Sequence, residues 1–374
     1  MTMIKAVRFH GKGDVRLDTI PALECGPDEL RVEVAYCGIC GTDVHEYLGG
    51  PIFPPQHGCK NPHTGVSLPV VLGHEFSGTI IEIGSKVTGF QLGQHVAVNP
   101  SLDDVTYGLE LCTACRAGRP NICKRWACLG LSGPGGGFSD EVVVNSHCCI
   151  PLPEGVSLKA GALAEPLAVA SHMIRLSGFK KGDCVAVLGA GPIGLALLLL
   201  LKALGASAVV ISEIAESRIL QAQKFGADEV VDPRQASLSR IDPLLEAIQK
   251  FSPDGADISF DTTGLQATLD SAVVAVKPGG VVFNVAIHEK PLSFNPNDFA
   301  FQEKKFMGGI CYTNEDFVIA LEAIRSGAVP ADDFVTSVVP LEDIVQGGFM
   351  ELIQNKEHHV KILIQPSLDG VKNQ

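Results

Sequence analysis

The sequence lacks an excess of positive charge, a long hydrophobic run, internal repeats and low-complexity segments. Its 29 basic residues are outnumbered by 42 acidic ones, so the formal net charge is −13. Such a chain repels phosphates and anionic lipids, which argues against nucleic acid or a membrane surface as a partner. The apolar stretch Leu195–Leu201 ends at Lys202. It is too short to span a bilayer and predicts a buried helix.

A secretory signal is also missing, because Met1–Phe9 carries Lys5 and Arg8 in a strand-like pattern without a hydrophobic core segment. We therefore expect a cytoplasmic protein. Its twelve cysteines are clustered rather than spaced like a disulfide framework, which favours metal ligation. At 374 residues the chain is long enough for two domains, and its 46% hydrophobic content is typical of a globular protein.

Two patterns follow each other along the chain. Residues 1–160 carry short strand-like runs separated by many Gly and Pro residues, which predicts a compact antiparallel barrel. The Pro-rich segment Gly49–Leu68 interrupts them without periodicity. From about Ala168, strands and helices alternate, ending with a strand at Val281–Ala286, which predicts a doubly wound parallel sheet. The tail contains a helix predicted at Leu341–Gln354 and is expected to rejoin the first domain.

A glycine-rich turn follows the predicted strand Cys184–Leu188. Strand, turn, helix and a second strand ending at Glu213 form the dinucleotide-binding fingerprint, with the acid 24 residues after Gly189. An ordinary strand–helix–strand unit is the alternative. The residues expected to bind a dinucleotide here are Gly189, Gly191, Pro192, Ile193, Gly194 and Glu213.

Three residues from separate segments, Cys40, His74 and Glu165, offer the sulfur, nitrogen and oxygen ligands of a catalytic zinc site. Taken singly, each has an ordinary explanation. Cys40 could be a buried thiol, His74 a core imidazole and Glu165 a carboxylate at a helix start.

The motifs around these residues resemble those of the zinc-dependent medium-chain alcohol/polyol dehydrogenases. They are Gly38–Asp43, Gly73–Gly78, Ala164–Leu167 and the glycine turn. Within that family, His45–Phe53 and Cys311–Phe317 resemble the 2,3-butanediol dehydrogenases most. The resemblance implies an α/β protein with a GroES-like β-rich catalytic domain (1–166 and 307–374) and a Rossmann doubly wound parallel sheet (167–306).

The resemblance also assigns roles around the catalytic zinc. It makes Cys40, His74 and Glu165 zinc ligands, with Glu75 as a less certain alternative ligand. It places Asp43 behind the His74 ring, where a carboxylate fixes the ring's tautomer. By the same resemblance, Thr42 takes the proton of the alcohol and His45 passes it on to solvent.

A second cysteine group, Cys112, Cys115 and Cys123, resembles the family's structural-zinc lobe. The family has a fourth cysteine at the position of Leu109. A carboxylate can replace a thiolate on zinc, so Asp103, Asp104 or Glu110 is a candidate fourth ligand. The alternative is a metal-free loop with three reduced thiols.

Cofactor choice depends on Glu213, which is expected to bind the ribose hydroxyls and to repel a 2′-phosphate, so NAD is favoured over NADP. By resemblance, Arg218 lies beside that ribose, Ala286 and His288 border the nicotinamide, and Lys361 approaches the pyrophosphate. Ordinary structural roles are equally open for the last three.

These observations together predict a zinc-dependent NAD oxidoreductase that acts on a secondary alcohol, with 2,3-butanediol and acetoin as the expected substrates. The alternatives are a sorbitol- or xylitol-type polyol dehydrogenase and a non-catalytic cofactor-binding relative. We expect Ile52 and Phe53 to border the alcohol pocket, unless Gly49–Leu68 is only a surface or subunit-contact loop. A homo-oligomer, a dimer or tetramer, is also expected.

Overall fold

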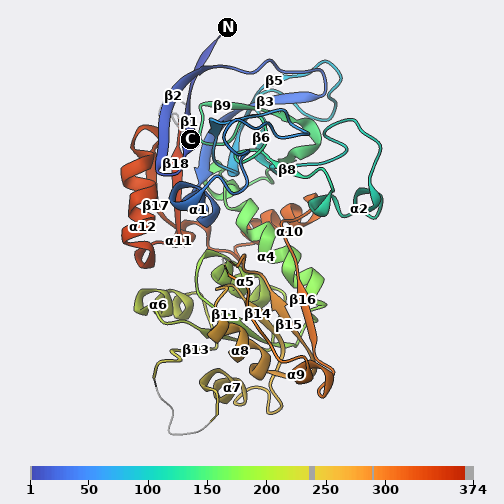
Figure 1. Cartoon of the computed structure of the whole chain (residues 1–374), viewed down its shortest axis with the longest axis vertical. Coiled ribbons are helices and arrows are strands. Elements are labelled where there is room, and N and C mark those ends of the chain that lie inside the picture. The colour runs from blue at the N-terminus through green and yellow to red at the C-terminus, as the bar shows by residue number, and fades with distance from the viewer. Residues whose placement is uncertain (1, 236–240, 289, 367–374) are drawn as a thin grey trace. The chain divides into compact units, whose positions relative to one another are not determined.

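The computed structural model describes residues 2–235, 241–288 and 290–366 (Figure 1). The chain divides into two compact units. The first comprises Met1–Glu165, Thr313–Arg325 and Pro330–Gln374, and the second comprises Pro166–Tyr312 and Ser326–Val329. A boundary after residue 306, as the sequence suggested, would cut through strand β16 (Lys305–Gly308), which belongs to the second unit.

The main sheet of the first unit joins strands from both ends of the chain. Strand β18 pairs antiparallel with β3, so that Leu363 lies opposite Gly38, whereas β17 and β18 run parallel. The sheet is therefore mixed rather than purely antiparallel. Its order is β10 (Cys149–Pro151), β6 (His95–Val98), β5 (Glu75–Ile83), β3 (Glu29–Gly38), β18 (Lys361–Gln365) and β17 (Val335–Pro340), and β9 (Glu141–Asn145) also pairs with β3.

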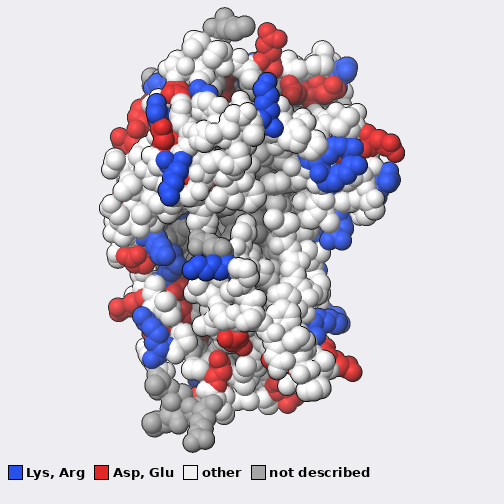
Figure 2. Space-filling model, viewed as in Figure 1, with Lys and Arg blue, Asp and Glu red and all other residues white. Residues whose placement is uncertain are grey.

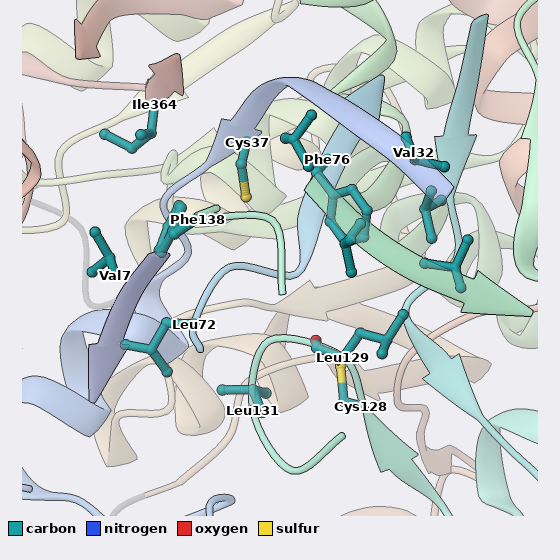
Figure 3. Packing of buried hydrophobic residues seen from close by; sticks show 14 of the residues in the cluster. Val7, Val32, Cys37, Leu72, Phe76, Cys128, Leu129, Leu131, Phe138 and Ile364 are labelled. Atoms are coloured by element: carbon teal, nitrogen blue, oxygen red, sulfur yellow. Dashed lines mark hydrogen bonds between the residues drawn. The ribbon is translucent and has the colours of Figure 1, made fainter. Parts of the chain in front are cut away.

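Two smaller sheets complete the first unit. One has the order β2 (Asp14–Pro21), β1 (Met3–Gly11) and β4 (Val70–Val71), and the other pairs β7 (Ser101–Leu102) with β8 (Ala127–Cys128). The alternation of β3 buries Leu30, Val32 and Val34 completely. Figure 3 shows Phe76 and Phe138 packed among the aliphatic side chains of this core.

Short helices surround these sheets. They are α1 (Gly41–Gly49), α2 (Thr113–Arg116), α3 (Leu158–Gly161), α10 (Asn314–Arg325) and α11 (Ala331–Phe334), with 3₁₀ turns at Pro120–Ile122, Ser146–Cys148 and Lys356–His358. The prediction of one α-helix at Leu341–Gln354 is wrong. It consists of a 3₁₀ turn, a π-helical segment (Ile344–Met350) and α12 (Glu351–Gln354).

Six parallel strands form the sheet of the second unit, in the order β13 (Glu229–Val231), β12 (Ala208–Ser212), β11 (Cys184–Leu188), β14 (Ala256–Asp261), β15 (Val276–Asn284) and β16. This confirms the predicted doubly wound fold. The sequence pattern missed β16, because its mostly exposed residues do not form the continuous apolar run of an inner parallel strand. The helices are α4 (Ala164–Ser177), α5 (Pro192–Ala203), α6 (Glu216–Lys224), α7 (Pro243–Ile248), α8 (Gln266–Ala275) and α9 (Asn297–Ala300), and α4 begins at the end of the first unit. Across the described ranges, no helix has the length and apolar character needed to cross a membrane.

Candidate active site and metal centres

The first group of candidate residues lies at the start of helix α1. Cys40 is the N-cap residue of α1 and has extended backbone angles. It lies between the end of β3 at Gly38 and the first residue of the helix, Gly41. The Asp43 carboxylate is fully buried, and its Oδ2 accepts a hydrogen bond from the Cys40 backbone N–H at 2.9 Å. Thr42 is half-buried in the first turn, and His45 is exposed one turn later. The start of α1 therefore fixes the position of the Cys40 thiol relative to the Thr42 hydroxyl.

The second group, Gly73–Glu75, reaches the same place from β4 and β5. Gly73 has a φ of +92°, and a Cβ there would lie 2.7 Å from the backbone nitrogen of Phe138, so only glycine fits. Glu75 is the first residue of β5 and is paired with Gly38 across the sheet. A Cβ on Gly38 would lie 2.1 Å from Glu75 Oε2, so this glycine makes the room that the carboxylate occupies.

These segments bring the ligand atoms of Cys40, His74 and Glu75 within 4.8 Å of one another. Ligands around one tetrahedral zinc, with bonds of about 2.0–2.3 Å, lie roughly 3.3–3.8 Å apart, so a small movement would suffice to bind the ion. His74 Nδ1 lies 3.5 Å from Asp43 Oδ1, and neither buried atom has a hydrogen-bond partner. The thiol, imidazole and carboxylate are a donor set that suits zinc.

The electrostatics of this cluster favour a cation. Burial lowers the pKa of His74, but the nearby Asp43 carboxylate and Cys40 thiol raise it more, so the pKa lies well above its usual value. The cluster thus attracts a proton strongly. Metal binding releases such protons, and the same negative surroundings that hold the proton would hold a divalent ion.

Lys361 lies inside the first unit beside this cluster. Its ammonium donates to both oxygens of Glu75, at 2.8 and 2.7 Å, and to the carbonyl oxygen of Ile39 at 3.2 Å. The residue is only 3% exposed. Burial lowers the pKa of Lys361, and the charges of Glu75, Cys40 and Glu165 raise it more, so the ammonium stays charged. Glu75 would therefore compete with the cofactor pyrophosphate for the Lys361 ammonium.

Glu165 is 7% exposed at the start of α4, and its charge contributes to the raised pKa of Lys361. Within the described ranges it is not part of the group that includes Cys40 and His74, whereas Glu75 is. The choice between the two carboxylates as zinc ligand stays open. Both Glu165 and Glu75 stay predicted ligands, and Glu75 is the one whose ligand atom lies within 4.8 Å of those of Cys40 and His74.

The second cysteine group gathers around Asp104. The ligand atoms of Asp104, Cys112, Cys115 and Cys123 all lie within 4.8 Å of one another. Cys112 Sγ is 3.6 Å from Cys115 Sγ and 3.9 Å from Cys123 Sγ. These separations match the edge of about 3.8 Å expected for thiolates around one tetrahedral zinc.

Asp104 is singled out from the other two candidate ligands by its surroundings. Its side chain is fully buried, accepts a hydrogen bond from the Cys112 backbone N–H at 2.6 Å and pairs with Arg125. Burial raises the pKa of Asp104, but these two partners lower it more, so the carboxylate is ionised. Glu110 is 93% exposed, and Asp103 caps the following turn through Val105 and Thr106.

The glycine turn of the second unit has the close contacts that its motif requires. Gly189 has a φ of +99°, and a Cβ there would lie 2.7 Å from Thr262 Oγ1. A Cβ on Gly194 would lie 1.9 Å from the Gly189 carbonyl oxygen, so helix and turn touch. At Gly191, in contrast, the nearest atom is Arg218 Nη1 at 4.0 Å. This open space at the N-terminus of α5 suits a pyrophosphate; Pro192 and Ile193 form the first turn of that helix.

Glu213 follows β12 and contacts this turn. Its Oε2 accepts a hydrogen bond from the Ala190 N–H at 2.8 Å, and its Oε1 accepts from the N–H groups of Ile214 and Ala215 at 2.7 and 2.9 Å. The carboxylate is thus fixed at the carboxyl edge of the sheet, next to the glycine turn. Such a position is where a ribose binds in this type of sheet.

Ala286 and His288 follow β15 at the same edge of the sheet. His288 Nε2 lies 2.7 Å from Asn284 Oδ1, and its Nδ1 lies 3.3 Å from the Gly264 carbonyl oxygen. A Cβ on Gly264 would lie 3.4 Å from the Ala286 Cβ. Both residues therefore lie at the candidate cofactor edge of the sheet, and their contact with a nicotinamide stays a prediction.

Sequence reasoning missed one buried carboxylate close to the catalytic residues. Glu46 in α1 is fully buried and accepts hydrogen bonds from the backbone N–H groups of Ile52 and Phe53. Its spacing of four residues from Thr42 is the only sequence signal that could have pointed to it.

On the face shown in Figure 2, basic side chains are interspersed with acidic ones and do not form a continuous basic surface.

Comparison with known families identifies the class. Residues 26–154 match the alcohol dehydrogenase GroES-like domain, and residues 192–326 match the zinc-binding dehydrogenase domain. The chain belongs to the zinc-binding alcohol dehydrogenase family, and it is a member over nearly its whole length.

Individual relatives narrow the similarity. The chain is 40% identical to a (R,R)-butanediol dehydrogenase of Saccharomyces cerevisiae, over 98% of this chain and 99% of the relative. A probable D-xylulose reductase A of Aspergillus clavatus is 32% identical, over 90% of this chain and 89% of the relative. The crystal structure of the Bacillus subtilis 2R,3R-butanediol dehydrogenase superposes with a TM-score of 0.89 at 36% identity, covering 97% of this chain and all of that one.

One solved relative was crystallised with a cofactor. It is described as a putative zinc-binding dehydrogenase of Sinorhizobium meliloti bound to NADP, and it superposes with a TM-score of 0.84 at 30% identity, covering 98% of this chain and 100% of that one. The two butanediol dehydrogenases are 40% and 36% identical to this chain, whereas the probable D-xylulose reductase is 32% identical.

Proposed function

We propose that this protein oxidises 2,3-butanediol to acetoin with reduction of NAD, and reduces acetoin and diacetyl in the reverse direction. The observation that supports this most is the gathering of Cys40, His74 and Glu75 next to the helix that carries Thr42 and His45. The names of its full-length relatives supply the substrate class.

Cys40 and His74, together with Glu75 or Glu165, would hold the catalytic zinc. A zinc ion bound there supplies a Lewis acid that lowers the pKa of a bound hydroxyl group. Asp43 Oδ1 lies 3.5 Å from His74 Nδ1 and would hold the orientation of this ring. The Lys361 ammonium donates to both oxygens of Glu75 and so holds this carboxylate in one orientation.

Thr42 and His45 would move the alcohol proton. The Thr42 hydroxyl in the first turn of α1 accepts the proton of the substrate hydroxyl and donates its own onward. His45 lies three residues further along, on the neighbouring part of the same helix face, and is exposed to water. An exposed imidazole is suited to pass that proton on to solvent.

The cofactor is proposed to be NAD. The Glu213 carboxylate lies at the glycine turn, where it would accept hydrogen bonds from ribose hydroxyls and repel the charge of a 2′-phosphate. Arg218 lies near Gly191 and would offer a phosphate partner. Since one solved relative is bound to NADP, the kcat/KM values of this protein for NAD and NADP should be measured directly.

The cysteine lobe is proposed to hold a second, structural zinc through Cys112, Cys115, Cys123 and Asp104. Four protein ligands leave no open coordination position, which is the property of a structural site. The described cysteines form no disulfide bond, and we propose that the protein resides in the cytoplasm.

We also propose that the protein is a homo-oligomer. Strand β16 is the edge of the six-stranded sheet. Phe306 in this strand is 45% exposed and packs against Phe294 and Phe299 in a small aromatic cluster, and the nearby Phe301 is 83% exposed. An exposed apolar edge strand is a template for pairing with another copy, and a two-fold axis would make the two edges antiparallel.

A substrate panel tests the proposed function. The purified protein, with zinc and NAD, should show a higher kcat/KM for 2,3-butanediol than for sorbitol or xylitol, and it should consume NADH with acetoin or diacetyl. Better turnover of sorbitol would support the polyol dehydrogenase instead. A zinc-loaded protein that binds NADH but turns over no alcohol would indicate the non-catalytic relative.

A further inference from the structure

We infer that Arg234 is a specificity-determining residue for the cofactor, because its guanidinium is the group that the chain offers to a phosphate on the adenosine ribose, and that Asp232 positions it. The inference deepens the proposed function, since it rests on the assignment of the ribose to Glu213. Its basis is a series of contacts next to the glycine turn, all of them within the second unit.

The first observation is that Arg234 is tied to the residue that follows Glu213. Arg234 Nη2 donates to the carbonyl oxygen of Ile214, and the N–H of the same Ile214 donates to Glu213 Oε1 at 2.7 Å. One residue of backbone therefore separates the guanidinium from the carboxylate. The hydrogen bond with Asp232 raises the pKa of Arg234 most, desolvation lowers it, and the charge of Glu213 raises it again. Contacts and charge both place Arg234 beside Glu213.

The second observation is that Asp232, directly after β13, fixes this guanidinium. Asp232 Oδ1 accepts from Arg234 Nε at 2.9 Å and from its backbone N–H at 3.0 Å, and Asp232 Oδ2 accepts from Nη2 at 2.8 Å. The Asp232 side chain is 10% exposed, whereas that of Arg234 is 63% exposed. The pair is thus anchored at its acid and open to solvent at its base. A guanidinium held in this way suits a phosphate, which it can bind through two parallel hydrogen bonds.

The third observation separates Arg234 from the other arginine of this region, Arg218 in α6. Arg218 Nη1 lies 4.0 Å from a Cβ built on Gly191, at the N-terminus of α5, where the pyrophosphate is expected. Arg234 is instead linked to Glu213 through Ile214. Arg218 is therefore assigned to a phosphate that NAD and NADP share, and Arg234 to the phosphate that NADP alone carries.

Glu213 and Arg234 act on a 2′-phosphate in opposite directions. The Glu213 carboxylate is 7% exposed and is held by three backbone N–H groups, so its charge stays close to the ribose and repels the phosphate. The exposed guanidinium attracts the same phosphate. The preference for NAD is therefore the balance of two fixed charges, and loss of Glu213 leaves Arg234 unopposed.

Dissociation constants of NAD and NADP, measured by titration calorimetry without an alcohol, test the inference. In a Glu213→Ser background, Arg234→Gln should weaken NADP binding at least about 10-fold and leave NAD binding within about 2-fold, because the two cofactors differ only in the 2′-phosphate. Arg218→Gln should weaken both alike. The matched control is Lys250→Gln, which breaks an exposed ion pair with Glu229 at the other end of β13 and should change neither constant.

Two further measurements separate phosphate binding from a structural role. Arg234→Lys keeps the charge and loses the planar fork, so it should retain part of the NADP affinity that Arg234→Gln loses. The Tm of Arg234→Gln should match that of the Lys250→Gln control, because both changes break an exposed ion pair. A lower Tm together with equal weakening of NAD and NADP would reduce Arg234 to a structural residue and overturn the inference.

The inference also fails if Arg234→Gln leaves the ratio of the two dissociation constants unchanged, or if Arg218→Gln alone removes the affinity for NADP. Failure of the proposed function looks different. If the wild-type protein prefers NADP, the role of Glu213 is wrong, and Arg234→Gln in the wild-type background then decides the inference by the same ratio. Failure to oxidise 2,3-butanediol affects neither constant.

Discussion

Buried carboxylates in this protein differ in their partners, and the partners define their tasks. Asp104 is bound by a backbone N–H and a guanidinium next to three thiols, whereas Glu75 is bound by an ammonium next to one thiol and one imidazole. Glu213 accepts hydrogen bonds from the backbone N–H groups of Ala190, Ile214 and Ala215. The first suits a closed metal site, the second a site with an open position, and the third a ligand's hydroxyl groups.

Asp104→Asn should remove zinc from the cysteine lobe and leave the catalytic site loaded. The amide is a weaker, uncharged ligand, so the metal content should fall by about one zinc per chain. Elemental analysis of the purified protein measures this. The matched control is Glu110→Gln, which changes an exposed acid of the same loop and should keep the full content. Equal zinc in both variants would contradict a ligand role for Asp104.

Glu213→Ser should narrow or reverse the preference for NAD over NADP. It removes the charge that repels a 2′-phosphate, and the ratio of the two kcat/KM values should shift at least about 10-fold, or roughly 1.4 kcal/mol. The ratio is the appropriate measurement, because loss of the bond to the Ala190 N–H weakens binding of both cofactors alike. Glu216→Ser, an exposed acid on the next helix, is the control. A wild-type protein that prefers NADP would contradict the role of Glu213.

One element differs from the prediction made from the sequence, at a place where it packs closely against the main sheet. The segment Ile344–Met350 is π-helical, and it contains Gly347 and Gly348. A Cβ on Gly348 would lie 2.5 Å from Ile39 Cδ1, and one on Gly347 would lie 3.0 Å from Val339 Cγ1. The π-helical segment therefore approaches the main sheet more closely than a regular amphipathic helix would. No periodicity in the sequence predicts this close approach.

The edge strand β16 leads to a prediction about assembly. Phe306→Lys places a charge on the exposed edge and should convert the proposed oligomer into smaller species, because edge charges oppose strand pairing. Light scattering after gel filtration measures the mass. Leu220→Lys changes a comparably exposed apolar residue on α6 and should leave the mass unchanged. A wild-type protein that is already monomeric would refute the proposed interface.

The whole molecule is expected to keep its fold without the catalytic metal. The core of the first unit consists of buried residues such as Val32, Phe76 and Phe138, and the second unit has a separate core around its parallel sheet. Neither core is organised by the metal ligands alone, in contrast to a small metal-nucleated module.

Treatment with a chelator should therefore abolish alcohol oxidation and leave the far-ultraviolet circular dichroism largely unchanged. Added zinc should restore activity. Full activity in a preparation shown to contain no metal would refute the zinc assignment. Loss of the circular dichroism signal would show instead that the metal stabilises the fold of the chain.

The sequence by itself determined the class of fold, the family and most of the candidate residues, because these depend on local patterns. Alternating apolar strands and helices predict a parallel sheet from neighbouring residues only, and the glycine turn requires glycine wherever the backbone folds that way. Such features survive in the sequence as short motifs with fixed spacing.

Only the tertiary structure decided which residues meet across the chain. It gathered Asp104 with the three cysteines of the lobe, gathered Glu75 with Cys40 and His74, and paired Lys361 with Glu75 across 286 positions. Charged and polar side chains can pair with any partner that the fold brings near, so their pairing leaves no periodic trace in the sequence. Pairing is decided by the packing of strands from both ends of the chain, and that is a property of the folded molecule alone.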